Sequence, residues 1–228
     1  MPRNQRCVLP DCPYHITQRG TNRQRVFFTE SDRATYLRLL SQNQADAGTR
    51  VLAWCLMPNH IHLIAVPERS DSLAVLLRRV HGRYAQMVNA RRLRSGHLWQ
   101  NRFYSCPLSG SHLWRALAYV ESNPVRAGLV ERPEHYKWSS AAAHLGLVKD
   151  RTGLLDQDFW HSQGGPAGWR ELLMKPEEAI ELRTLRRCTY AGRPYGEDSF
   201  VDRFEEQFQR RWRRWSFEDD RQLHTFAS

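Results

Sequence analysis

The stretch AWCLMPNHIHLIAV, residues 53–66, decides how the rest of this sequence can fold. Two apolar runs of strand length meet in it at the turn signal Pro58–Asn59, and this pattern predicts a β-hairpin. Side chains at positions i and i+2 of a strand lie on the same face of a sheet. His60 and His62 are therefore predicted to lie side by side, while Ile61 points to the opposite face and into the core.

Helical and strand-like patterns alternate on both sides of this hairpin. One antiparallel sheet with helices packed on it, an α+β sandwich, is the simplest layout for such an order. The expected elements are a strand, a turn at Gly20–Asn22 and a short second extended piece within 13–29, a helix at 31–47 with Ser31 and Asp32 as cap candidates and Gly48 at its end, the hairpin at 50–66, a helix at 72–94 capped by Asp71 and Ser72, a strand at 103–108, and a helix that begins at Ser111 and stops at Pro124.

The character of the sequence changes near residue 150. The segment 150–176 is rich in Gly, Pro and Trp and has weak periodicity. Helices are predicted at 177–187 and 198–213, with a loop between them. We therefore expect one α+β domain at 1–149 and a mostly helical extension at 150–228 that binds DNA or a partner. The last helix has an aromatic face, which fits packing, and a basic end, which fits a DNA clamp: Arg210, Arg211, Arg213 and Arg214.

The charge balance points to a nucleic-acid partner. The chain of 228 residues has 34 basic and 24 acidic residues, a net charge of +10. Lysine occurs only at 137, 149 and 175, which leaves 31 arginines among the 34 basic residues. The planar guanidinium group matches phosphate and stacks on bases. A genome that encodes Arg in place of Lys would explain the ratio but not the basic surplus.

Composition excludes several classes of protein. A hydrophobic content of 41% and a charged content of 25% are typical of globular chains, not of disordered or fibrous ones. The sequence contains no run of about 18 apolar residues, so no transmembrane helix is predicted. The N-terminus does not resemble a signal peptide. Five cysteines at irregular spacing favour reduced thiols in a cytoplasmic protein, with Cys55 and Cys106 as small core residues.

A second candidate group accompanies the histidine pair. Tyr119 and Asn123, spaced i to i+4, share one face of the predicted helix, and Glu121 is expected to point away from it into solvent. Taken alone, Tyr119 fits a packed aromatic and Asn123 fits a helix stop before proline. Taken with His60 and His62, which could equally be a coincidental pair, they suggest a different site. Two neutral histidines and an amide oxygen can hold a divalent ion, and a nearby phenol can attack phosphorus.

Four strings in this order, PYHITQRGTNRQRVFF, AWCLMPNHIHLIAVP, GHLWQNRFYS and AYVESNPVRAGLV, resemble the single-tyrosine transposases of the HUH superfamily, and among them the REP-associated branch. The resemblance covers about residues 13–146 and implies an RRM-like sandwich. It implies that His60 and His62 bind Mg²⁺ or Mn²⁺, that Tyr119 is the nucleophile and that Asn123 is the third ligand. It also implies a bacterial, nucleoid-associated protein that acts on single-stranded DNA at imperfect hairpins, the repeated extragenic palindromes.

Further residues are candidates for contact with DNA. The arginine-rich turn after residue 18 can grip phosphates or remain a solvated loop, and the block HLWQNRF at 97–103 can contact DNA or brace the core. Tyr84 and Tyr104 compete with Tyr119 for the role of nucleophile, but helical spacing with Asn123 favours Tyr119. The candidate DNA-binding residues are Arg19, Arg23, Arg25, Arg83, Trp99, Gln100, Arg102, Arg115 and Arg126.

The resulting hypothesis is a single-stranded DNA transposase. Tyr119 would cleave at the foot of a hairpin and leave a 5′-phosphotyrosine and a free 3′-OH for rejoining. One rival is a replication-initiator or relaxase nickase, whose additional regions 228 residues do not obviously hold. Another is a domesticated DNA-binding protein that keeps the fold without catalysis. A small-molecule hydrolase is disfavoured by the charge and by the lack of a carboxylate near His60. Both a monomer and a homodimer fit the sequence.

Overall fold

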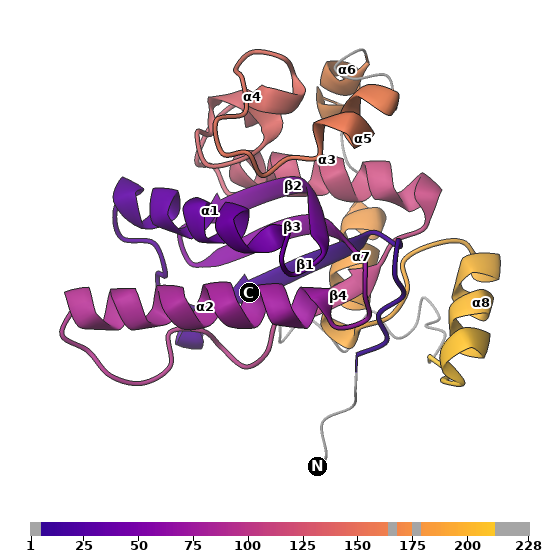
Figure 1. Ribbon diagram of the computed structural model, residues 1–228. Coiled ribbons are helices and arrows are strands. Elements are labelled where there is room, and N and C mark those ends of the chain that lie inside the picture. The colour runs from indigo at the N-terminus through magenta and orange to yellow at the C-terminus, as the bar shows by residue number, and fades with distance from the viewer. Residues whose placement is uncertain (1–5, 164–167, 175–178, 213–228) are drawn as a thin grey trace.

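The computed structural model describes residues 6–163, 168–174 and 179–212 (Figure 1). Its centre is a four-stranded antiparallel sheet with the strand order β2-β3-β1-β4. One helix joins β1 to β2 and another joins β3 to β4, which is the βαββαβ order of ferredoxin-like folds. The predicted α+β sandwich is therefore confirmed. The strands are β1 (Tyr14–Arg19), β2 (Thr49–Met57), β3 (His60–Pro67) and β4 (Tyr104–Pro107).

Two helices, α1 (Glu30–Gln44) and α2 (Ser72–Arg91), cover one face of the sheet, in front of it in Figure 1. A capping box starts α1: the Thr29 hydroxyl accepts from the Asp32 backbone N–H, and the Asp32 carboxylate accepts from the Thr29 N–H. The cap is therefore Thr29, not the predicted Ser31 or Asp32, because the box needs its acidic residue three positions later. The core of this face includes Tyr14, Ile16, Tyr36, Leu40, Leu56, Ile61, Leu63, Leu73 and Tyr84.

The opposite face of the sheet is covered by α3 (Gly110–Arg126), which packs on β2 and β3, and by α7 (Ala179–Ala191), which packs on β4 and β1. The second core lies between them and includes Ala53, Ile64, Leu117, Val120 and Leu185. Cys55 and Cys106 are fully buried in it, as predicted, and the cysteines are free thiols. The sheet is therefore buried on both faces.

The sequence predicted that this helix stops at Pro124, but α3 continues to Arg126. Proline lacks the backbone N–H that would bond the carbonyl four residues earlier, which here belongs to Val120. The side chain of Asn123 supplies a donor in its place, with Nδ2 3.4 Å from the Val120 carbonyl oxygen. A local side-chain bond therefore allows the helix to pass the proline.

The sequence predicted that Glu121 is solvated, but its side chain is fully buried. Its Oε1 accepts from the Ser140 hydroxyl at 2.5 Å and lies 2.6 Å from His144 Nδ1. Its Oε2 accepts from Trp169 Nε1 at 3.0 Å. The side of α3 that carries Glu121 faces the helices α4 (Ala141–His144), α5 (Gln157–Ser162) and α6 (Trp169–Met174), which Figure 1 shows grouped above α3. A segment distant in sequence therefore covers the face that helical spacing alone assigned to solvent.

Other boundaries also differ from the sequence predictions. The turn predicted at Gly20–Asn22 is present as a short 3-10 turn, η1 (Thr21–Arg23), whereas residues 24–29 after it form no strand. The prediction of a loop at 188–197 is wrong for its first residues, because α7 continues to Ala191. The last helix, α8 (Asp198–Phe208), ends earlier than predicted, because Gln209 adopts a left-handed conformation with φ of 46°. Arg213 and Arg214 lie outside the described residues.

The segment after α3 covers both edges of the sheet. After the short turn η2 (Pro133–His135), the chain runs along β2, where Leu56 N–H donates to the Trp138 carbonyl at 2.8 Å. At the other edge, the Tyr195 N–H donates to the Pro107 carbonyl at 2.9 Å. Exposed strand edges are sites of unwanted pairing, so this cover protects the sheet. Among the described helices, none has the length and apolar character needed to cross a membrane.

The buried Glu121 carboxylate gives a test of how α3 is held. Glu121→Ala leaves the donors of Ser140, His144 and Trp169 buried without their acceptor. We expect the free energy of unfolding to fall by about 3 kcal/mol or more, measured by urea denaturation. Glu181→Ala is the matched control, because it removes only a half-exposed ion pair with Arg115 and should cost less than about 1 kcal/mol. Equal losses in the two variants would contradict this role of Glu121.

Candidate active site

Two histidines of β3 lie on the sheet face that α3 and α7 cover. Antiparallel register places His60 opposite Arg19 and His62 opposite Thr17 of β1. The ring centroids of the two histidines are 4.9 Å apart. Ile61 points to the other face and is fully buried. The side-by-side placement predicted from the alternation of the strand is confirmed.

A third histidine, which the sequence analysis did not single out, fixes the orientation of His62. His15 Nε2 lies 2.9 Å from His62 Nδ1, and His15 Nδ1 lies 2.7 Å from the Thr189 hydroxyl. Thr189 donates its only hydroxyl proton to the Leu185 carbonyl at 2.8 Å, so it accepts from His15 Nδ1–H. Neutral His15 then accepts from His62 Nδ1–H. This relay leaves the lone pair of His62 on Nε2.

A separate contact fixes the tautomer of His60. Its Nδ1 lies 2.6 Å from Asn59 Oδ1, and Asn59 directs its own Nδ2 to the Arg23 carbonyl at 3.2 Å. Because an amide oxygen can only accept, His60 carries its proton on Nδ1 and its lone pair on Nε2. Both histidines of β3 therefore keep one ring nitrogen ready to ligate a cation, with the other nitrogen held by a protein group.

The three histidines are neutral. Burial lowers the pKa of His15 to about 3, and the positive charge of Arg126 adds to the effect. Burial also lowers the pKa of His60 to about 3, with further contributions from Arg19 and Arg186. The pKa of His62 lies well below its usual range, mainly through burial. Neutral imidazole is the form that binds metal ions.

Tyr119 of α3 lies against these histidines. Its ring stands edge-on to those of His15 and His62, with centroids 5.5 Å from each. Arg186 of α7 donates from Nε to the phenolic oxygen at 3.2 Å. The guanidinium of Arg126 lies 4.4 Å from the centre of the Tyr119 ring and also bonds the Tyr119 carbonyl. The phenol is thus placed beside His15, His62 and two guanidinium groups, which can attract a phosphate group.

The competing tyrosines are placed differently. Tyr84 belongs to α2 and is fully buried, and its hydroxyl donates to the Val26 carbonyl at 2.7 Å. It therefore packs the opposite face of the sheet. Tyr104 lies on the same face as the histidines, but its ring contacts Tyr190 of α7, with centroids 4.9 Å apart.

The side chains of this site could hold a divalent ion only by combining histidine nitrogens with an oxygen ligand. Within the described parts of the chain, no cluster of three or more His, Cys, Asp or Glu side chains is arranged to hold a metal. His60 and His62 present two ring nitrogens on one face, so a third protein ligand would have to be an amide or hydroxyl oxygen. Asn123 is buried one helical turn after Tyr119, and its Nδ2 is directed back to its own helix. Its carbonyl oxygen is a ligand type that Mg²⁺ and Mn²⁺ accept.

Some of the predicted DNA-binding residues surround this site. The charge of Arg19 contributes to the lowered pKa of His60, and the guanidinium of Arg126 lies over the Tyr119 ring. The turn that bears the exposed Arg23 and Arg25 packs on the β2–β3 turn, since Gly20 N–H donates to the Asn59 carbonyl at 2.9 Å. The exposed Gln100 is joined to Arg19 through its backbone at 2.8 Å.

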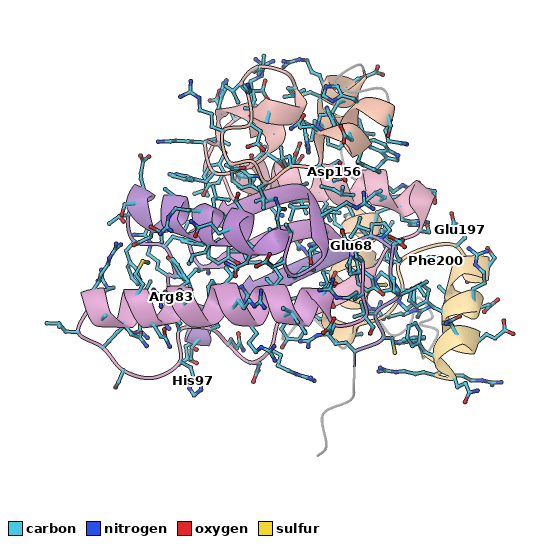
Figure 2. All side chains as sticks on the ribbon, in the orientation of Figure 1. Glu68, Arg83, His97, Asp156, Glu197 and Phe200 are labelled. Atoms are coloured by element: carbon cyan, nitrogen blue, oxygen red, sulfur yellow. The ribbon has the colours of Figure 1, made fainter. Side chains whose placement is uncertain are left out.

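Other predicted residues lie elsewhere. Arg83, labelled in Figure 2, is exposed on α2, which covers the opposite face of the sheet. Trp99 is 8% exposed and packs with Tyr36, His81 and Tyr84, which favours its interpretation as a core anchor. Arg115 forms an ion pair with Glu181 at 2.5 Å, at the outer side of α3 and α7. Arg102 is exposed beside β4.

Three residues that hold the site were missed by the sequence analysis: His15, Arg186 and Thr189. A usable signal existed only for His15, which shares the alternating face of β1 with Thr17 and Arg19. Arg186 and Thr189 contact residues 67 and 174 positions away. No local pattern could reveal those contacts, because they depend on how α7 packs on the sheet.

Comparison with known proteins assigns this chain to a family. Residues 8–123 match the family model described as "Transposase IS200 like". The match spans half of the chain, and the chain belongs to this family. A protein of Haemophilus influenzae, provisionally named a REP-associated tyrosine transposase, is 28% identical over 100 residues, which are 39% of this chain and 57% of that protein. The chain thus spans little more than half of that relative.

A solved structure of a REP-associated tyrosine transposase bound to a REP hairpin has a similar fold. The TM-score is 0.55 at 19% sequence identity, over 65% of this chain and 88% of the other. At this level of identity the likeness establishes the shared fold, including the RRM-like sheet with its packed helices.

The neutral state of His15 predicts a pH dependence of stability. Its pKa in the folded chain, about 3, lies below the value of about 6.5 for an unfolded chain. The unfolded state therefore binds more protons between these values, and stability falls as the pH drops from 6.5 towards 3. In metal-free buffer, His15→Asn should reduce this slope by up to about 1.4 kcal/mol per pH unit, measured by urea unfolding at several pH values. An unchanged slope would show that His15 is charged in the folded chain.

Proposed function

We propose that this chain is a REP-associated tyrosine transposase, which cleaves and rejoins single-stranded DNA at hairpin sites through a 5′-phosphotyrosine. The observation that carries the proposal is the meeting of Tyr119 with His15 and His62, at ring distances of 5.5 Å. Residues from α3 and β3 that are distant in sequence converge there with cations on the phenol. The family of the chain makes DNA strand transfer the chemistry that such a site serves.

The residues of the chain can be assigned to parts of the reaction. The Tyr119 oxygen attacks the scissile phosphorus, and the bond from phosphorus to the 3′ oxygen breaks. The phenol loses its proton, and the 3′ oxygen leaves and gains one as a free 3′-OH. Rejoining reverses this exchange with the 3′-OH of another strand. Because only 4% of Tyr119 is exposed, neighbouring groups must move before a phosphate can enter. Arg186, which donates to the phenolic oxygen, is placed to contact that phosphate.

His60, His62 and Asn123 are the residues that would hold Mg²⁺ or Mn²⁺ in this proposal. A bound divalent ion would polarise the scissile phosphate and offset its developing charge. The fixed tautomers of His60 and His62 support the assignment, since each keeps Nε2 free of a proton.

The proposed DNA partner fits the charge of the chain. A net charge of +10, carried mostly by arginine, favours binding to a phosphate backbone. The similar solved structure is described as bound to a REP hairpin, and the same kind of DNA is proposed here. Arg19, Arg23, Arg25 and Arg126 lie around the site and are the residues expected to hold the phosphates.

The covalent intermediate gives the direct test. Purified protein is mixed with a pool of single-stranded hairpins in Mn²⁺, labelled at either the 5′ or the 3′ end, and run on a denaturing gel. We expect a protein adduct that carries the 3′ label, because the tyrosine keeps the 5′ phosphate of the downstream fragment. Tyr119→Phe and His60→Ala should abolish it, whereas Tyr104→Phe should retain it. DNA binding without an adduct in Mg²⁺ or Mn²⁺ would instead indicate a DNA-binding protein that has lost catalysis.

The hydrogen-bond relay from Thr189 predicts an effect on metal affinity. Thr189→Val keeps the shape of the side chain but removes the acceptor for His15 Nδ1–H, which frees both His15 and His62 to rotate. We expect Mn²⁺ to bind about 10- to 100-fold more weakly, measured by calorimetric titration without DNA. Thr189→Ser keeps the hydroxyl and should retain affinity. Equal affinities for the Val variant and the wild type would contradict this role of the relay.

A further inference from the structure

A cavity of about 400 Å³ opens at the edge strand β4, beside the proposed active site. Its wall comes from four parts of the chain: the N-terminal segment, the stretch from 101 to 105, the end of α7 and the segment after α8. The lining residues include Arg6, Arg102, Tyr104, Thr189, Tyr190 and Arg210. The volume is within the range of small-ligand sites, about 300 to 1,000 Å³.

The charge of this cavity is one-sided. Arg6, Arg102 and Arg210 line it, and among the residues that the structure describes none of those lining it is acidic. The Arg6 guanidinium lies 3.6 Å from the centre of the Phe103 ring and donates to the Phe103 carbonyl at 2.7 Å. Burial lowers the pKa of Arg6 to about 10, and the charge of Arg102 adds to the effect. An anion bound between these guanidinium groups would relieve that repulsion.

Aromatic surface lies next to these cations. Tyr190 of α7 is 49% exposed, and its ring meets the Tyr104 ring at 4.9 Å and an angle of 71°. An exposed aromatic face beside several arginines is typical of sites for single-stranded nucleic acid, where a base stacks on the ring and cations hold the phosphates. A ligand with only anionic groups would leave the exposed Tyr190 ring without a stacking partner.

The cavity adjoins the proposed active site at Thr189. Thr189, which lines it, bonds His15, and Tyr190 follows Thr189 on α7. Burial raises the pKa of Tyr190, and nearby groups that act on it include Arg19, Tyr119 and Tyr104. Tyr190 therefore lies within electrostatic range of the proposed nucleophile. A strand whose phosphate reaches Tyr119 would pass this cavity.

We propose that this cavity binds one unpaired nucleotide of the DNA strand that enters the active site. The base stacks on Tyr190, and the adjoining phosphates contact Arg6, Arg102 and Arg210. The inference rests on the proposed function, since it assigns a subsite to the same DNA substrate. Arg102 lies within the matched residues 8–123, whereas Arg6, Tyr190 and Arg210 lie outside them, so the flanking segments of this chain supply most of the proposed contacts.

The test compares two single-stranded tails on the full-length protein. A fluorescein-labelled hairpin carries a 5′ tail of about ten thymidylates, or a tail of the same length built from abasic residues that keep the phosphates. Fluorescence anisotropy measures both affinities. We expect the wild type to favour the tail with bases by about tenfold or more, from stacking on Tyr190. Tyr190→Ala should bring this ratio close to one, and Tyr190→Phe, which keeps the ring, should retain it.

A second pair of variants tests the cations. Arg210→Gln should weaken binding of both tails and lower the salt dependence of affinity by about one unit of slope. Arg38→Gln, at an exposed position of α1 on the opposite side of the sheet, should change neither. Thermal melting of each variant confirms that it is folded.

The outcomes separate this inference from the proposed function. If Tyr190→Ala keeps the full preference for bases, the subsite is overturned, whether or not the covalent adduct forms. If the preference depends on Tyr190 but the wild type forms no adduct, the subsite stands and the transposase chemistry falls. If the wild type binds neither tail, both proposals are overturned.

Discussion

The docking of α3 on the histidine face of the sheet is the constraint on which the site depends. Tyr119 and Glu121 are two residues apart, so they point to nearly opposite sides of this helix. Glu121 is fixed by three buried donors on one side, and Tyr119 meets His15 and His62 on the other. Because Glu121 holds one side of α3 in place, Tyr119 on the other side has a defined position.

The helix α7 adds a second constraint. Arg186 and Thr189 are three residues apart and therefore lie on one side of α7. One contacts the phenolic oxygen of Tyr119, and the other orients His62 through His15. The segment outside the family match thus does more than cover the sheet. It contacts Tyr119 directly and His62 through His15.

The sequence predicted those parts of the site that depend on local periodicity. Alternation in a strand placed His60 beside His62, and helical spacing placed Tyr119 one turn before Asn123. Burial of Glu121 could not be predicted, because helical spacing says which side a residue faces but not what covers that side. The roles of His15 and Thr189 depend on a contact across 174 positions. Pro124 misled the prediction because the Asn123 side chain replaces the missing backbone donor.

The most direct measurement for the central claim is mass spectrometry of the trypsin-digested protein after reaction with a single-stranded hairpin in Mn²⁺. The claim is that the packing of α3 makes Tyr119, and not another tyrosine of the same face, the residue that attacks phosphorus. The expected result is a nucleotide on the peptide ALAYVESNPVR, which contains Tyr119 as its only tyrosine. A nucleotide on a peptide with Tyr104 or Tyr190 would contradict the claim.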